Sequence, residues 1–144
     1  MTEAPSVRRP AAPRARALAR PVAVAAGTAA AATLIGLVDP HQPGHYPGCP
    51  FLALTGFYCP GCGGLRMVNS LVHGHVGTAF GSNPLALLAL PVALYLWGRW
   101  TWLAARGERM RSALYRPAVG WAAVGLALVY WIVRNLPFAH FLAP

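Results

Sequence analysis

The three cysteines of the chain are the residues whose type and spacing could carry chemistry. Cys59 and Cys62 have C-x-x-C spacing across a Pro-Gly pair that bends the backbone, and Cys49 lies upstream of them. Two cysteines at this spacing can bind one metal ion, and structural zinc takes four ligands. The cysteines therefore predict a zinc site that lacks one ligand. Three histidines could complete it, His45, His73 and His75, and we take His73 as the fourth ligand of this hypothesis.

The same spacing supports two other interpretations. A C-x-x-C pair at the start of a helix is stabilised as a thiolate by amide donors and the helix dipole, which would suit a thiol–disulfide enzyme. In that enzyme Cys59 would be the attacking thiol and Cys62 the resolving one. Alternatively, the cysteines are small buried apolar residues in a tight turn, or they form a static disulfide. Spacing alone leaves all three interpretations open.

Other catalytic chemistry has little support. The only acids are Glu3, Asp39 and Glu108, which are too few and too scattered for carboxylate-based hydrolysis or a magnesium site. Arg66 is the only cation between positions 39 and 82. It could anchor an anionic head group or a carboxylate, or simply lie on the polar face of a helix. Outside the thiols, we assign no catalytic residue.

Composition places these residues in a membrane protein. Hydrophobic residues make up 56% of the chain and charged residues only 10%, whereas soluble domains carry about 25% charged residues. Three apolar runs free of charge begin near positions 22, 84 and 118. In the second run, Asn83 suits the helix N-cap and Pro84 the first helical position. We therefore predict an all-α integral membrane protein of about three transmembrane helices, with a short amphipathic helix in the first loop.

The predicted segments follow the chain in a simple order. They are a disordered basic tail (1–20), a first span (21–38), a cysteine segment (39–82), a second span (83–103), a basic loop (104–117), a third span (118–136) and a C-terminal tail (137–144). The first run ends without a small-residue cleavage site, so we favour an uncleaved signal anchor over a cleaved signal peptide. From Leu65 onward apolar residues recur every three or four positions. This pattern predicts an amphipathic helix that breaks at Gly74.

The arginines predict orientation. The net charge is +9, and the arginines gather before the first span and between positions 99 and 116, whereas only Arg66 and Arg134 fall on the other side. This positive-inside pattern predicts a multi-pass protein of the cell membrane with a cytoplasmic N-terminus and an extracytoplasmic C-terminus. The partner is then the lipid bilayer, with self-association or other membrane proteins as further candidates. Arginines that gather between apolar runs do not indicate nucleic-acid binding.

The stretch from Cys49 to Leu85 resembles a family of small bacterial membrane proteins classed as a domain of unknown function. The resemblance rests on Cys49-Pro-Phe, Thr55-Gly-Phe-Tyr-Cys-Pro-Gly-Cys-Gly, Arg66, His73-Gly and Asn83-Pro-Leu. Leu65 departs from the pattern, since many members carry threonine there. The resemblance implies a membrane protein with a cysteine motif near one membrane face, and it implies no activity.

Together these features favour a non-enzymatic membrane scaffold or accessory subunit whose cysteines are held by zinc or by a disulfide. The alternative is an extracytoplasmic thiol–disulfide oxidoreductase that uses Cys59 and Cys62. Zinc is the candidate cofactor.

Overall fold

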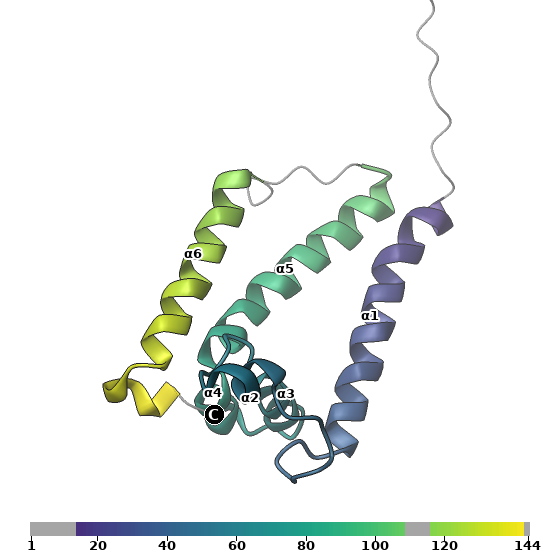
Figure 1. Ribbon diagram of the computed structural model, residues 1–144. Helices are drawn as coiled ribbons and strands as arrows, with labels where there is room; N and C mark the ends of the chain where they lie inside the picture. Colours follow the sequence, from purple (N-terminus) through teal and green to yellow (C-terminus); the bar gives the residue numbers. More distant parts are fainter. Residues whose placement is uncertain (1–13, 109–115, 143–144) are drawn as a thin grey trace, which may run out of the picture.

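The computed structural model describes residues 14–108 and 116–142, and all regular secondary structure within these ranges is helical. Three long helices, α1 (Arg14–Leu37), α5 (Pro84–Arg106) and α6 (Pro117–Arg134), form the body of the molecule (Figure 1). The short helices α2 (Pro50–Thr55), α3 (Gly64–Val72) and α4 (Val76–Ser82) gather at one end of this body. The all-α prediction is confirmed.

The long helices have the length and composition of membrane spans. Residues Arg16–Leu37 of α1 and all of α6 are each long and apolar enough to cross a bilayer, and α4 with α5 counts as a third span bent by 113°. Their large apolar side chains point outward, as with Leu37 (80% exposed) and Trp121 (75% exposed). Such exposure is costly in water and natural in lipid, so the described residues form a membrane protein of two or three spans.

Helix α1 begins earlier than the first apolar run. Positions 14–20, which the composition predicts to be part of a disordered tail, form the first turns of α1. Alanine and arginine are strong helix formers, and no proline interrupts them before Pro21. Residues 1–13 of the expected tail lie outside the described residues. The indole of Trp97 donates a hydrogen bond to the Pro21 carbonyl (3.0 Å), which ties α1 to α5.

The amphipathic segment consists of two helices, as predicted. Gly74 adopts a φ of +80° between α3 and α4, a conformation that favours glycine and ends the first helix. Two polar side chains of this segment, Asn69 and Ser70, are buried together with Met67, whereas Leu65 and Val72 are exposed. The Asn69 side chain donates to the Ile35 carbonyl at 2.8 Å. The buried side of the segment thus includes polar groups, one of which binds the backbone of α1.

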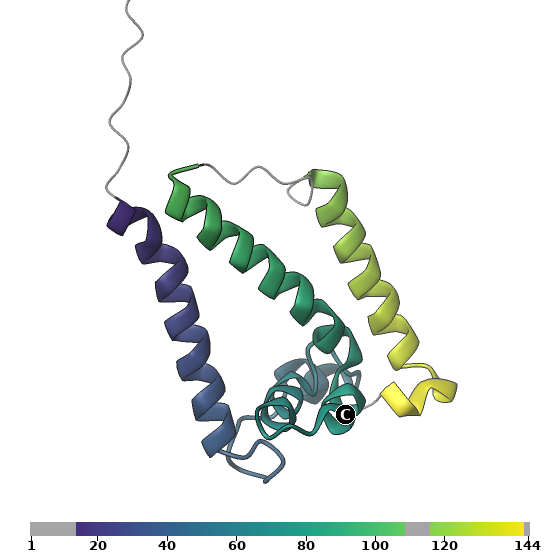
Figure 2. The same cartoon turned by 180° about the vertical axis from the view of Figure 1, so that it is seen from behind.

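Two further elements were not predicted. Helix α2 starts at Pro50 directly after Cys49 and ends at Gly56, which has a φ of +73°. After α6 the chain forms a 3-10 helix, η2 (Pro137–Leu142), in place of a plain tail. The main backbone neighbour of α6 is η2, while α1 packs along α5 and α3. Seen from behind, α6 stands beside α5 with its last turn near the short helices (Figure 2).

Candidate metal centre

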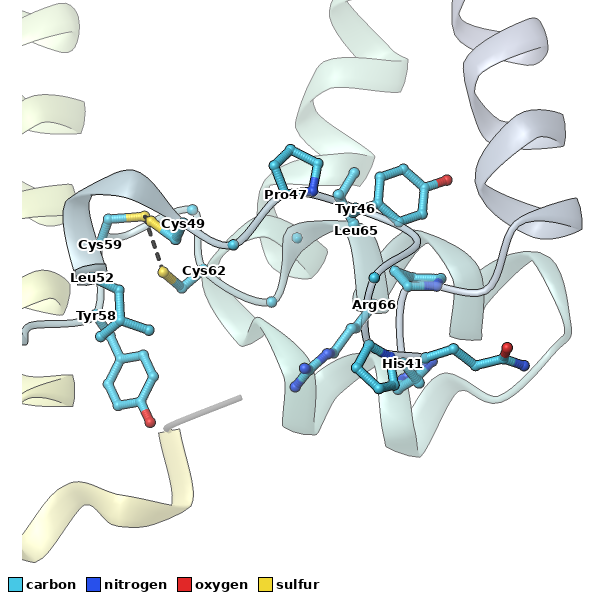
Figure 3. Close-up of a pocket in the computed structure, with 18 residues that line it drawn as sticks. His41, Tyr46, Pro47, Cys49, Leu52, Tyr58, Cys59, Cys62, Leu65 and Arg66 are labelled. Carbon is cyan, nitrogen blue, oxygen red and sulfur yellow. Dashed lines mark hydrogen bonds between the residues drawn. The ribbon is translucent and has the colours of Figure 1, made fainter.

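The three cysteines meet at the end of the molecule that carries the short helices. Cys49 precedes α2, and Cys59 and Cys62 lie in the turn between α2 and α3. The Sγ atoms of Cys59 and Cys62 are 3.2 Å apart, those of Cys49 and Cys59 are 3.6 Å apart, and all three lie within 4.8 Å of one another (Figure 3). All three are free thiols. Two sulphurs bound tetrahedrally to one zinc at about 2.3 Å are roughly 3.8 Å apart, which is close to this spacing.

The local backbone explains why the sulphurs converge. The amide of Cys62 donates to the Cys59 carbonyl at 3.1 Å, and the amide of Gly64 donates to the Gly61 carbonyl at 3.0 Å. Gly63 then adopts a φ of +82° as the N-cap of α3. These consecutive turns fold the Pro-Gly pair outward and bring both thiols of the C-x-x-C pair to the same side.

Arg134, the last residue of α6, holds this turn from behind. Its side chain is 2% exposed, and Nη1 donates to the carbonyl oxygens of Cys59 (3.0 Å) and Cys62 (3.3 Å), while Nη2 donates to that of Leu142 (2.9 Å). The guanidinium also lies against the rings of Tyr58 and Tyr130. No carboxylate pairs with Arg134 among the described residues. A buried cation without a counter-ion therefore lies directly behind the cysteine turn.

Two asparagines complete the support. Asn83 donates from Nδ2 to the carbonyls of Pro60 (2.9 Å) and Cys62 (3.2 Å), and its Oδ1 accepts from the Ala86 amide as the N-cap of α5. Asn135 exchanges two hydrogen bonds with the backbone of Tyr58, at 2.8 and 2.9 Å. The cysteine turn is thus tied to the start of α5 and the end of α6. The predicted N-cap role of Asn83 is confirmed.

The surroundings shift the pKa values of Cys49 and Cys62 in opposite directions. The Leu52 amide, followed by the thiol of Cys62, lowers the pKa of Cys49, although Cys49 completes no capping hydrogen bond. Burial, followed by the hydrogen bonds with Cys59 and Cys49, raises the pKa of Cys62 to about 12. Without a metal, Cys49 is therefore the readier thiolate and Cys62 stays protonated.

The histidines predicted as fourth ligands have other contacts. Nδ1 of His73 lies 2.8 Å from the Asn69 carbonyl at the end of α3, and Nδ1 of His45 lies 3.0 Å from the Asp39 carbonyl. Among the described residues, the group of converging ligand atoms contains only the three cysteines. The structure brings together Cys49, Cys59 and Cys62 and does not bring His73 to them.

The sulphurs border a cleft of about 530 Å³. The segment from Pro40 to Cys49 forms one wall, and the segment from Tyr58 to Arg66 forms another. Figure 3 shows the cysteines on one side of the cleft and Arg66 and His41 on the other. The predicted cation Arg66 therefore shares one cleft with the cysteines.

Sequence reasoning missed Arg134, Asn135 and the contacts of Asn83 with the cysteine turn. From sequence alone, Arg134 is only one of two arginines on the predicted extracytoplasmic side. The small number of arginines on this side is the signal that could have identified Arg134, because an isolated cation at the end of a membrane span needs a polar partner.

This geometry involves the same residues that carry the sequence resemblance. Residues 49–97 match the family described as a protein of unknown function, DUF2752. The DUF2752 segment contains the three cysteines, Arg66 and Asn83, so the resemblance predicted from the motif is confirmed. Arg134 and Asn135 lie beyond the matched segment. No curated protein matches the chain, and no solved structure matches it.

Proposed function

We propose that the protein is a non-enzymatic membrane scaffold or accessory subunit in which Cys49, Cys59 and Cys62 hold one zinc ion. The observation that carries the proposal is the convergence of three Sγ atoms within 4.8 Å. Thiolates are ligands that zinc favours, and a Pro-Gly turn with positive-φ glycine beside it is a backbone suited to a metal knuckle.

Charge balance supports a bound cation. Three thiolates and one divalent ion leave a single negative charge, and the buried guanidinium of Arg134 supplies a single positive one. Without the ion, one thiol with a raised pKa lies beside a buried cation that no described carboxylate neutralises. Binding of zinc would convert the thiols to thiolates beside Arg134. The buried cation would then have negative charge nearby, and the buried thiol would become a metal ligand.

The scaffold role follows from what the site connects. The cysteine turn binds α5 through Asn83 and α6 through Arg134 and Asn135. Helix α6 has η2 as its main backbone neighbour, and these side chains link it to the cysteine turn. A metal that makes the turn rigid would hold the ends of the two helices together. In the proposed orientation this end faces the extracytoplasmic side. The proposed partners are the surrounding lipid and either a second copy of the chain or another membrane protein.

A thiol–disulfide oxidoreductase is the second candidate. Its specific support is the 3.2 Å separation of the Cys59 and Cys62 sulphurs, which are close enough to form a disulfide of about 2.05 Å when a substrate disulfide accepts the two electrons and two protons of the thiols. The convergence of a third thiol, that of Cys49, on the C-x-x-C pair makes zinc the better supported candidate.

Metal analysis of the full chain purified in detergent tests the proposal. We expect one zinc per chain in the wild type and in His73→Ala, and strong loss of zinc in Cys49→Ser, Cys59→Ser and Cys62→Ser. Zinc retained by all three serine variants would contradict the proposed ligands. A metal-free wild type with a reversible Cys59–Cys62 disulfide would favour the second candidate.

A further inference from the structure

The cysteine cluster leaves a tetrahedral metal one ligand short. Zinc sites take four ligands, and sites with three protein ligands keep the fourth position for water or a bound molecule. Among the described residues, no histidine, cysteine or carboxylate joins the three cysteines. The site described above therefore has the ligand count of an open centre rather than a closed one.

The cysteine cluster borders a cavity large enough for a small molecule. The cleft has a volume of about 530 Å³, within the usual range of ligand pockets of roughly 300–1,000 Å³. All three cysteines line it, and so do several glycines that let a ligand approach the backbone, Gly48, Gly61, Gly63 and Gly64. Cys49 and Cys59 are half-buried, whereas Cys62 is buried beneath them.

The other side of the cleft is positive. Arg66 lines it, is exposed, and forms no hydrogen bond or ion pair with the residues that the structure describes. Arg66 lies in the first turn of α3. The N-cap residue of this helix, Gly63, has no side chain that could accept hydrogen bonds from the first amides. Asp39, which precedes the lining segment in the chain, lies 2.8 Å from the ring of His41. An anion in the cleft would thus meet an arginine and the positive end of a helix dipole.

We infer that this cleft binds a small organic anion whose donor group fills the fourth metal position and whose carboxylate pairs with Arg66. The inference rests on the proposed metal centre and adds a ligand to it. The ligand class follows from the two ends of the cleft: a thiolate or similar soft donor suits a three-thiolate metal, and a carboxylate suits a guanidinium. The protein is then a ligand-binding membrane protein, with the metal as part of the recognition site.

Cobalt-loaded full-length protein in detergent provides the test. Cobalt(II) in a thiolate site has visible absorption bands that change when a ligand joins the metal. The probes are mercaptoacetate and 3-mercaptopropionate, with neutral 2-mercaptoethanol as the uncharged comparison. We expect the better of the two charged thiols to change the spectrum at about tenfold lower concentration than 2-mercaptoethanol. In Arg66→Gln this preference should fall to within about twofold, while cobalt binding itself is kept.

The matched control is Arg116→Gln, which removes an exposed arginine at the opposite end of α6 and should leave the preference unchanged. A cobalt spectrum that responds to no thiol would overturn the inference and leave the metal centre standing. Equal responses to charged and neutral thiols, or a preference kept in Arg66→Gln, would overturn the role of Arg66. A wild type that binds neither cobalt nor zinc would overturn the proposed metal centre itself.

Discussion

The guanidinium of Arg134 donates a hydrogen bond of 3.0 Å to the carbonyl oxygen of Cys59, joining the end of the last long helix to the cysteine turn. The same nitrogen reaches the Cys62 carbonyl, so one cation supports the backbone of both thiols in the C-x-x-C pair. Nε of Arg134 is buried without a partner among the described residues. Such a placement is costly unless negative charge lies nearby, and metal-bound thiolates would supply it.

The first prediction concerns this cation. Arg134→Gln should lower zinc affinity by about 10–100-fold, the usual effect of removing a group that supports metal ligands. Arg134→Lys should lose less affinity, because it keeps the charge but not the paired donors. Competition with a chromophoric chelator measures both.

Arg116→Gln serves as the control for Arg134 as well, since it also removes one positive charge from α6. If both substitutions reduce affinity equally, the effect of Arg134 is a general one of net charge rather than of its contacts. An Arg134→Gln variant with unchanged affinity would show that Arg134 does not stabilise the bound metal.

Zinc affinity should rise steeply with pH. The pKa of Cys62 is raised to about 12, so zinc must displace its proton throughout the range from pH 6 to 9. Each displaced proton gives about a tenfold gain in affinity per pH unit, and the lowered pKa of Cys49 reduces the contribution of that thiol as pH rises. Chelator competition at several pH values measures the slope, and an affinity independent of pH would contradict the assignment of Cys62 as a ligand.

The stability of the metal-free protein should fall with rising pH, whereas zinc affinity should rise. Because the folded state raises the pKa of Cys62 above its ordinary value of 9.0, the folded chain holds this proton more tightly than the unfolded chain. The free energy of unfolding should therefore fall as pH rises from about 9 toward 12. Thermal melts of zinc-stripped protein measure this, with zinc-stripped Cys62→Ser as the control that lacks the trend.

The fold and half of the site could be predicted because their signals are local. Apolar runs reveal spans, Gly74 reveals the break between α3 and α4, and C-x-x-C spacing brings Cys59 to Cys62. The contacts of Arg134 with the cysteine turn span more than seventy positions, and an arginine that ends a span also suits the membrane interface. Residue type makes His73 a candidate ligand, but its position after α3 turns its ring to the Asn69 carbonyl.

Asn83 combines two roles that substitution can separate. Asn83→Ala should lower the free energy of unfolding by about 1–3 kcal/mol, since it loses both the N-cap of α5 and the hydrogen bonds to the cysteine turn. Asn83→Ser keeps a capping oxygen but is too short to reach Pro60. It should recover only the capping part, about 1 kcal/mol. Equal stability of the serine variant and the wild type in thermal melts would show that the contacts with the turn contribute nothing.

The orientation predicted from the arginines can be tested by labelling. In a variant that keeps Cys59 as its only cysteine, a membrane-impermeant maleimide should label intact cells. The matched variant carries Ser112→Cys in a chain without native cysteines, and it should label only after permeabilisation, because position 112 falls among the arginines that predict the cytoplasmic side. The reverse pattern would place the cysteine segment in the cytoplasm.

Zinc-edge X-ray absorption of the purified full chain measures the metal environment most directly. We predict three sulphur neighbours at about 2.3 Å and a single further ligand, with the sulphur shell lost in Cys59→Ser. A shell of nitrogen and oxygen alone, or a sulphur shell that persists in Cys59→Ser, would contradict a metal centre built from Cys49, Cys59 and Cys62.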